Sequence, residues 1–382
     1  MGWPLVRLGE VISHRKDFIE IEPDETYARC RVQTSARGII LRDRVAGAEI
    51  KTKRQQVCRT GEFLVAEIDA KLGGYGIVPG ELEGAIVSSH YFLFEVDETK
   101  LLRGFLDWYS RTLDFLEQVK ARGSTNYAAI RPSNVLEYLI PLPPLAEQQR
   151  IVARLDRMAG LVEARARATA AMEADLQAML AKAFARCIDA APRRLMAEVA
   201  PLIRRPVAIE PDRDYTEIGV RSFYNGIFHR RTMPGSEFSW QALSWIKEGD
   251  LVFSNLMAWE QAIAVTEAHD EGTVGNHRML TCEVNPELAT PGFLLAYFRT
   301  PEGFASVVGN SPGTIARNKT LSSKKLPTIE VPVPPLETQH WFDRLQAKAR
   351  RIRSIRAASS RDADALIPAM LHEIFNGKAV AA

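Results

Sequence analysis

The sequence has little of what marks membrane, secreted and disulfide-rich proteins. Its four cysteines, at positions 30, 58, 187 and 282, are widely separated, and no two have C-x-x-C spacing. Neither a zinc knuckle nor a disulfide framework is therefore indicated, and we expect reduced thiols in a cytoplasmic protein. No apolar run approaches the roughly 18 residues that span a bilayer, and the N-terminus lacks the charged-then-apolar pattern of a signal peptide.

Motifs of catalysis are missing as well. The chain has no GxxxxGK[ST], no GxGxxG after a predicted strand and no HExxH. Gly73-Gly74-Tyr75-Gly76 lacks the helix that follows a phosphate-binding loop and predicts a turn. Asn285-Pro286-Glu287 is not the Asn-Pro-Pro-aromatic signature of adenine methyltransferases. His90 and His277 have no identifiable catalytic partner, and hydrogen bonding is their expected role. We expect no catalytic residue, no metal site and no bound cofactor.

Charge alone does not identify a partner. The 382 residues, enough for two or three domains, carry 49 basic and 47 acidic side chains, which gives a net charge of +2. A nearly neutral protein can still bind nucleic acid if its basic residues share a face. Basic clusters occur at Lys51, Lys53 and Arg54; Arg204 and Arg205; Arg230 and Arg231; Arg317 and Lys319; and Lys348, Arg350, Arg351, Arg353 and Arg356. Each cluster alone is equally compatible with an ordinary solvated surface.

A proline-rich stretch organises the chain. Residues 140–157 place three prolines within four positions, at Pro141, Pro143 and Pro144, directly before a long helical pattern. Proline ends a strand and is accepted in the first turn of a helix, so this stretch predicts a rigid exit from a globular unit into a helix. A similar stretch, residues 331–336, also precedes a long helical pattern.

The two exits belong to an internal repeat. Residues 21–27 (IEPDETY) match residues 209–215 (IEPDRDY), an offset of 188 (209 minus 21). The same register aligns Arg42 with Arg230, and it drifts to 191 at the prolines, where 143–145 match 334–336. So long a period excludes a solenoid and indicates a tandem duplication.

Each copy predicts an α+β unit followed by a long helix. Residues 63–68 and 85–96 are rich in β-branched and aromatic residues and predict strands, whereas 101–119 has helical spacing. Strands followed by helix, without regular alternation, favour α+β. The predicted segments are a unit at 1–139, an exit and helix at 140–189, a second unit at 190–330, and a second exit and helix at 331–382.

The long helices carry narrow apolar seams typical of a coiled coil, with a polar middle. Pro368 should kink or loosen the second helix near its end. Predicted packing positions are Ile151, Leu155, Met158, Val162, Leu176 and Met179, then Leu345, Ile352, Leu366 and Met370. The helices could pair antiparallel, with a unit at each end, or pack on a partner; the pattern leaves both open.

Together these features resemble the DNA specificity (S) subunit of type I restriction-modification systems. The resemblance covers almost the whole chain and is carried by residues 140–156 and by Gly-Asp-Leu-Leu-like stretches at 61–64 and 249–252. The second copy departs from it, because residues 337–341 (ETQHW) replace the AEQQR of 146–150.

The resemblance implies a non-catalytic protein. Residues 1–139 and 190–330 would be target recognition domains, each reading half of a bipartite site in double-stranded DNA. The helices would pair as an antiparallel coiled coil, set the spacing and dock two methyltransferase (M) subunits, which restriction/translocase (R) subunits would join. S-adenosylmethionine, Mg²⁺ and ATP would belong to those partners. The alternatives are a two-domain scaffold that binds only protein and a stand-alone nuclease or methyltransferase.

Polar segments that differ between the copies supply the candidate DNA contacts, since Arg and Lys read guanine and Asn and Gln read adenine. They are Arg37, Lys51, Lys53, Arg54, Gln55, Gln56, Asn126, Tyr127 and Arg131 in the first copy, and Arg221, Asn225, Arg230, Arg231, Asn255, Asn276, Arg317, Asn318 and Lys319 in the second.

Overall fold

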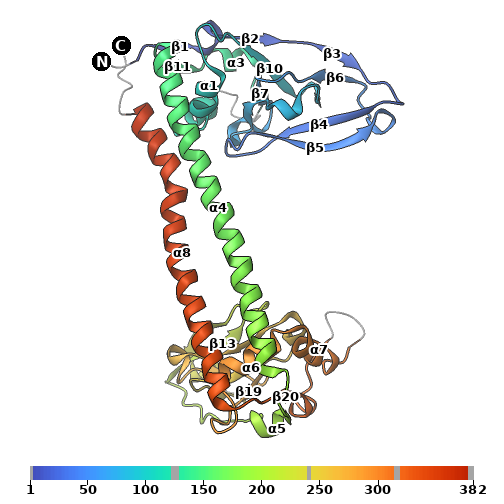
Figure 1. The fold of residues 1–382 in the computed structure, drawn as a ribbon, viewed down its shortest axis with the longest axis vertical. Helices are drawn as coiled ribbons and strands as arrows, with labels where there is room; N and C mark the ends of the chain where they lie inside the picture. The colour runs from blue at the N-terminus through green and yellow to red at the C-terminus, as the bar shows by residue number, and fades with distance from the viewer. Residues whose placement is uncertain (1–2, 122–128, 239–241, 314–318, 377–382) are drawn as a thin grey trace. The chain divides into compact units, whose positions relative to one another are not determined.

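The computed structural model describes residues 3–121, 129–238, 242–313 and 319–376. The chain divides into two compact units: residues 1–169 together with 357–382, and residues 170–356. Each unit holds one copy of the repeat and a part of both long helices, α4 (Leu145–Ile188) and α8 (Leu336–Asn376) (Figure 1). Among the described residues, no helix combines the length and apolar character needed to cross a bilayer.

The first unit is built from short strands and three short helices. Its strands are β1 (Leu5–Arg7), β2 (Ile12–Arg15), β3 (Phe18–Glu20), β4 (Thr26–Val32), β5 (Ile39–Ala46), β6 (Arg54–Val57), β7 (Phe63–Ala66), β8 (Tyr75–Ile77), β9 (Ile86–Val87), β10 (Tyr91–Val96) and β11 (Leu139–Pro141). They form sheets of order β2-β10-β7-β8 and β3-β6-β9-β4-β5 and a pair β1-β11. The helices are α1 (Arg103–Ser110), α2 (Leu113–Ala121) and α3 (Pro132–Leu136).

The second unit repeats this plan. Its strands are β12 (Arg193–Leu195), β13 (Asp214–Val220), β14 (Ile227–Pro234), β15 (Ser244–Trp245), β16 (Leu251–Ser254), β17 (Ile263–Val265), β18 (Val274–Gly275), β19 (Met279–Cys282) and β20 (Glu330–Pro332). They form sheets of order β17-β16-β19 and β14-β13-β18-β15 and a pair β12-β20. The helices are α5 (Met196–Val199), α6 (Pro291–Phe298) and α7 (Pro301–Gly309). The mixed α+β class predicted from the sequence is confirmed.

The register of the two hairpins confirms the internal repeat. In β4–β5 the pairing shifts between Arg29 and Cys30, and in β13–β14 it shifts between Glu217 and Ile218, 188 positions later. Such a shift inserts one unpaired residue and sharpens the local twist.

The helix predicted over residues 101–119 is in fact two helices, α1 and α2. The hydroxyl of Thr112 accepts a hydrogen bond from the Phe115 N–H and starts the second helix. Thr300 does the same for Gly303 at the start of α7. A threonine oxygen replaces the missing intrahelical partner of the first-turn amides, so the chain restarts a helix there although the apolar spacing runs on.

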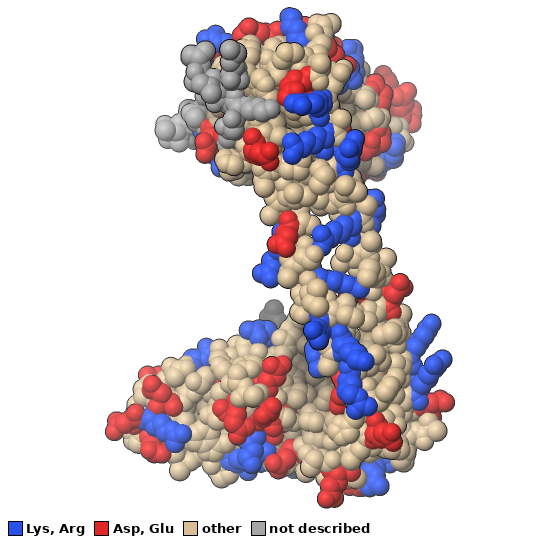
Figure 2. Space-filling model, turned by 60° about the vertical axis from the view of Figure 1, so that its left-hand side comes forward, with Lys and Arg blue, Asp and Glu red and all other residues tan. Residues whose placement is uncertain are grey.

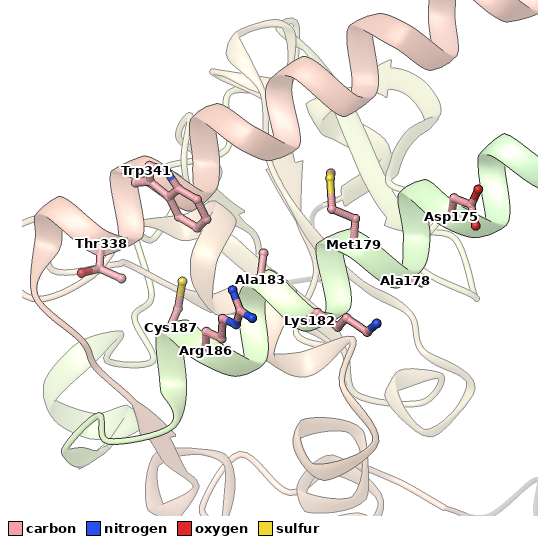
Figure 3. A pocket seen from close by; sticks show the side chains of 9 residues that line it. All are labelled: Asp175, Ala178, Met179, Lys182, Ala183, Arg186, Cys187, Thr338 and Trp341. Atoms are coloured by element: carbon pink, nitrogen blue, oxygen red, sulfur yellow. The ribbon is translucent and has the colours of Figure 1, made fainter.

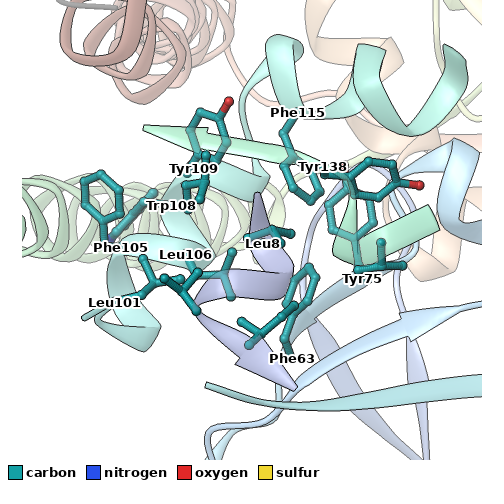
Figure 4. Close-up of a cluster of buried hydrophobic side chains, with 14 of the residues drawn as sticks. Leu8, Phe63, Tyr75, Leu101, Phe105, Leu106, Trp108, Tyr109, Phe115 and Tyr138 are labelled. Carbon is teal, nitrogen blue, oxygen red and sulfur yellow. The ribbon is translucent and has the colours of Figure 1, made fainter. Parts of the chain in front are cut away.

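The core of the first unit combines the aromatic and aliphatic side chains shown in Figure 4 with residues from the start of α4 and the end of α8. Phe63, Phe105 and Phe115 lie fully buried among strands and short helices. The start of α4 adds Ile151 and Leu155, and the end of α8 adds Met370, Leu371, Ile374 and Phe375. The apolar residues at the start of α4 and at the end of α8 are therefore buried in the core of the first unit.

The second core is completed in a corresponding way. The ring of Phe184, near the end of α4, lies 4.9 Å from that of Phe293 and 5.0 Å from that of Phe342, measured between ring centroids. All three are buried.

One glutamine in each unit fixes the start of a long helix. Gln148, fully buried, accepts from the Leu102 N–H at 2.8 Å and donates to the carbonyls of Lys100 and Pro143, both at 2.9 Å. Since a buried amide must be paired, these bonds hold the first turn of α4 against the entry to α1.

The seam of the long helices differs in part from the predicted one. Ile151, Leu155 and Met370 are buried, and Met158, Val162, Leu176 and Leu345 are half-buried. Met179, Ile352 and Leu366 are instead exposed, by 44%, 40% and 36%. In α8 the neighbouring residues Arg353 and Ile367 are less exposed. Arg353 forms an ion pair with Glu173 at 2.7 Å. This ion pair lies between the helices at the point where the apolar pattern predicted Ile352. The helix also continues through Pro368 to Asn376.

Two cysteines that are distant in sequence meet in the first unit. The buried thiols of Cys30 and Cys58 lie 3.6 Å apart, and both are free. Their separation of 28 positions carries no recognisable spacing motif.

Candidate nucleic-acid interface

The β4–β5 hairpin carries a concentration of arginines. Arg29 on β4 donates two hydrogen bonds, both 2.7 Å, to Asp43 on β5. This contact holds the pKa of the Asp43 carboxyl below its usual value and raises that of Arg29. Arg31, Arg42 and Arg44 lie exposed on the same two strands. The hairpin thus exposes three guanidinium groups to solvent, while the charge of Arg29 is neutralised by Asp43.

The β13–β14 hairpin has the equivalent pair with its charges exchanged. Glu217 occupies the place of Arg29, and Arg231 occupies that of Asp43. The Arg231 Nε donates to Glu217 at 3.0 Å, and Asn276 donates to the same carboxylate at 2.6 Å. Arg230 approaches it to 3.9 Å and stays exposed. The structure therefore gathers three predicted residues, Arg230, Arg231 and Asn276, around one buried carboxylate.

The turns that close these hairpins match each other too. Ser35 and Ala36 in the first, and Phe223 and Tyr224 in the second, all have positive φ between 51° and 62°. That backbone region is unfavourable for residues with a side chain. Each turn is held by two backbone hydrogen bonds. In the second copy these run from Phe223 N to Glu260 O and from Tyr224 N to Gln261 O.

Three predicted contact residues lie in or beside these turns. Arg37 and Asn225, in equivalent positions 188 apart, are exposed, and each bonds a carbonyl three positions earlier. Arg221 is exposed, donates to the Ile227 carbonyl at 2.7 Å and stacks over Phe228. The same scaffold position thus presents a cationic group in one copy and an amide in the other.

The other candidates of the first copy differ in their availability. Lys51 and Arg131 are exposed. The ammonium of Lys53 donates to the Gly47 carbonyl at 2.7 Å, and the guanidinium of Arg54 stacks 4.4 Å from the Phe18 ring centroid. Both glutamines point inward: Gln55 is 7% exposed and donates to Thr52 O, and Gln56 is 2% exposed and donates to Ser88 O and Tyr91 O. Contacts with bases by these two would require rearrangement.

The remaining candidates are less informative. Asn255 and Lys319 are half-buried. Asn126, Tyr127, Arg317 and Asn318 lie outside the described residues.

Sequence reasoning missed the arginines of the first hairpin. Arg31, Arg42 and Arg44 were not among the candidates, although Arg42 aligns with Arg230. The available signal was the alternation of arginine in 29–31 and 42–44, which is the period of a strand with one solvated face.

The long helices offer a different kind of surface. Large apolar side chains are exposed at Leu161, Met172, Met179, Ile352, Ile355 and Leu366. In the second unit a hollow of about 570 Å³ lies between the helices, lined by Met179, Ala183 and Cys187 of α4 and by Thr338 and Trp341 of α8 (Figure 3). Basic side chains also gather along the helical part of the chain (Figure 2). The hollow with its apolar lining and exposed Trp341 is a candidate surface for a protein partner.

One known protein family is similar to part of this chain. Residues 2–169 match the model of the type I restriction modification DNA specificity domain. This part of the chain is similar to that family. The resemblance predicted from the sequence is thereby confirmed. No curated protein matches the chain.

Solved structures share the fold over nearly the whole length. One, from a study of complex assembly and conformational transition of the type I R-M system, has a TM-score of 0.70 at 20% identity and covers 98% of this chain and 97% of its own. Another, the HsdS subunit from Thermoanaerobacter tengcongensis, has a TM-score of 0.59 at 21% identity, with 99% and 97% covered. These two structures therefore share the fold of this chain through both copies and both long helices.

Proposed function

We propose that this chain is the DNA specificity subunit of a type I restriction-modification complex. Each copy, residues 1–139 and residues 190–330, reads one half of a bipartite site in double-stranded DNA. The observation that carries the proposal is the family match of residues 2–169 on a scaffold that occurs twice with different exposed polar groups. The Arg29–Asp43 pair of the first copy is replaced by Glu217–Arg231 in the second. Different charges on the same scaffold suit two domains that recognise different half-sites.

The paired hairpins favour DNA over a scaffold that binds only protein. Arg31, Arg42 and Arg44 are exposed on one hairpin, and Arg230 and Arg231 on the other. Clustered guanidinium groups attract the phosphate backbone and can form bidentate contacts with guanine. Arg42 and Arg230 occupy equivalent places in the repeat, and a scaffold that binds only protein does not need an exposed arginine there in both copies.

The long helices act in this proposal as an antiparallel coiled-coil spacer. In support, one unit contains the first part of α4 with the last part of α8, and the other contains the last part of α4 with the first part of α8. Within the first unit Arg165 donates to the Ser359 carbonyl at 3.0 Å, and within the second Glu173 pairs with Arg353.

Two methyltransferase subunits dock on the helices, and restriction/translocase subunits join through them. The exposed apolar residues Met172, Met179, Ile352 and Ile355 support such docking. S-adenosylmethionine, Mg²⁺ and ATP belong to those partners. The chain by itself neither methylates nor cuts DNA. It acts in the cytoplasm, where the genomic DNA lies.

A domain exchange tests the function. The chain is expressed with its methyltransferase partner, and methylated sites are mapped genome-wide before and after residues 190–330 are replaced by the matching unit of a relative. One half-site should change while the other half-site and the gap stay the same. The reciprocal exchange of residues 1–139 is the matched control and should change the other half-site. An exchange that alters both half-sites, or methylation by this chain without a partner, contradicts the proposal.

A further inference from the structure

We propose that the second unit contains a binding site for a divalent transition-metal ion, Zn²⁺ in the first place, formed by His229, His269 and Asp270. His229 lies on β14, and the other two lie in the short 3-10 helix Ala268–Asp270. One ligand atom from each of the three residues lies within 4.8 Å of the other two. The site does not depend on the proposed function, because metal binding is measured on the protein alone.

The distances fit a metal centre. Asp270 Oδ1 lies 3.0 Å from the Nε2 of His229 and 3.4 Å from the Nε2 of His269. Ligands placed 2.0–2.1 Å from a tetrahedral zinc lie roughly 3.3–3.4 Å from one another. A small movement of His229 would therefore admit the ion between the three atoms.

The chemistry of the set selects the ion. Imidazole nitrogen suits zinc, copper, iron and nickel, whereas magnesium and calcium prefer oxygen ligands throughout. Two histidines and one carboxylate leave a further coordination position for water or another ligand, as in zinc sites that are not closed.

The carboxylate is held in place before any ion binds. Asp270 is 1% exposed, and its Oδ2 accepts the Glu267 N–H at 2.9 Å, which leaves Oδ1 for the histidines. Its backbone carbonyl accepts the Thr273 hydroxyl at 2.7 Å. The imidazoles, by contrast, are 40% and 65% exposed, so an ion can reach the site from solvent.

A second carboxylate stands behind one histidine. A carboxylate oxygen of Glu267 lies 3.7 Å from the Nδ1 of His269. Metal-bound histidines commonly direct their other nitrogen at a carboxylate, and Glu267 is the carboxylate near that nitrogen of His269. In both histidines the Nε2 atom is the one that lies near Asp270 Oδ1, so these two nitrogens are the ones that would bind an ion.

The first copy does not share this set. Subtracting the repeat offset of 188 places Leu41, Glu81 and Leu82 at the positions of His229, His269 and Asp270. The shared scaffold therefore does not need the three residues. A bound ion would join β14 to the 3-10 turn in the second copy and so fix the strand that carries Arg230 and Arg231.

Titration of the tag-free full chain tests the site. After treatment with a chelator and removal of the chelator, Zn²⁺ is added in a calorimeter and Co²⁺ in a spectrophotometer. We expect one ion per chain, a Co²⁺ spectrum of nitrogen and oxygen ligands, and a higher melting temperature with Zn²⁺. His229→Asn and His269→Asn should each weaken binding more than about tenfold, since even outer-shell partners of a ligand contribute 10–100-fold.

The matched control is His90→Asn in the first unit. His90 is also exposed and also pairs with a carboxylate, Glu67, at 2.6 Å, so its loss should leave the affinity unchanged. Because both site histidines are exposed, their variants should fold, which circular dichroism checks. A wild-type chain that binds no stoichiometric Zn²⁺, site variants that bind like wild type, or a sulfur-to-cobalt charge-transfer band would each overturn the proposal.

Discussion

Phe375 in α8 packs its ring against Phe105 in α1, with ring centroids 5.5 Å apart and planes inclined at 65°. The first copy of the repeat thus closes its core with a side chain from the far end of the sequence. Phe184 of α4 plays the corresponding part against Phe293 in the second unit. Each copy is therefore completed by the helix that follows the other copy, which makes both helices part of both folded units.

Replacing Phe375 by alanine should destabilise the first unit selectively. The side chain is 1% exposed and also contacts Trp3 and Tyr109, so its loss leaves a cavity among aromatic rings. Phe→Ala changes in cores cost about 3–5 kcal/mol. Hydrogen exchange followed by mass spectrometry should show faster exchange in residues of the first unit. Leu366→Ala, on the same helix but 36% exposed, is the control and should have little effect. Equal effects of the two changes would contradict this packing.

The buried glutamines predict a second selective effect. Gln339 bonds the Thr290 N–H and the carbonyls of Leu288 and Pro334, the same set that Gln148 makes in the first unit. Gln148→Met keeps the volume but leaves three backbone groups unpaired, at about 1–3 kcal/mol for each buried group.

Denaturant unfolding and the exchange rate of the Leu102 amide measure this effect. That amide donates to Gln148 and should lose protection in the variant. The adjacent Gln149 is exposed, so Gln149→Met is a matched control that should change neither quantity. An unaltered Leu102 amide in Gln148→Met would count against the assigned bond.

The large features of the fold were predictable because they depend on patterns that extend over many residues. The offset of 188 revealed the duplication, and the spacing of apolar residues predicted α4, which runs from Leu145 to Ile188. Retention of Gln339 where the second copy otherwise departs from the motif was visible in the sequence. Its meaning was not, because nothing local distinguishes a buried glutamine from an exposed one.

The finer features depend on single side chains and could not be read from periodicity. An apolar pattern prefers Ile352 as a seam residue, yet Arg353 takes the inward place through its pair with Glu173. The candidate site was partly predicted, since Arg230, Arg231 and Asn276 do meet at Glu217. Gln55 and Gln56 turn inward instead, because backbone carbonyls nearby accept their amides.

Substitutions on the hairpins should separate base reading from phosphate binding. Arg230 is exposed, and we expect Arg230→Ala to cost about 1–3 kcal/mol on the specific site and to relax one position of one half-site. Lys51→Ala should weaken binding to all sequences alike and lower the salt slope by about one unit. Binding of the assembled complex to the specific site and to single-base variants, at several salt concentrations, measures both. Uniform weakening by Arg230→Ala would reassign that residue to the phosphate backbone.

The spacer role of the helices predicts a change in gap length without a change in base preference. One heptad inserted after Thr169 in α4 and one after Arg356 in α8, at the limits of the two units, keep both seams nearly in phase. Seven residues lengthen a helix by about 10.5 Å, which corresponds to about three base pairs at 3.4 Å each.

Methylated sites mapped with this variant should therefore keep both half-sites and show a longer gap. Insertion in α4 alone is the control: it puts the two seams out of step and should reduce folding or assembly rather than shift the gap. If the double insertion left the gap unchanged while the complex still methylated DNA, the helices would not set the distance. If it changed a half-site instead, they would take part in reading bases, because a pure spacer has no contact through which to alter base preference.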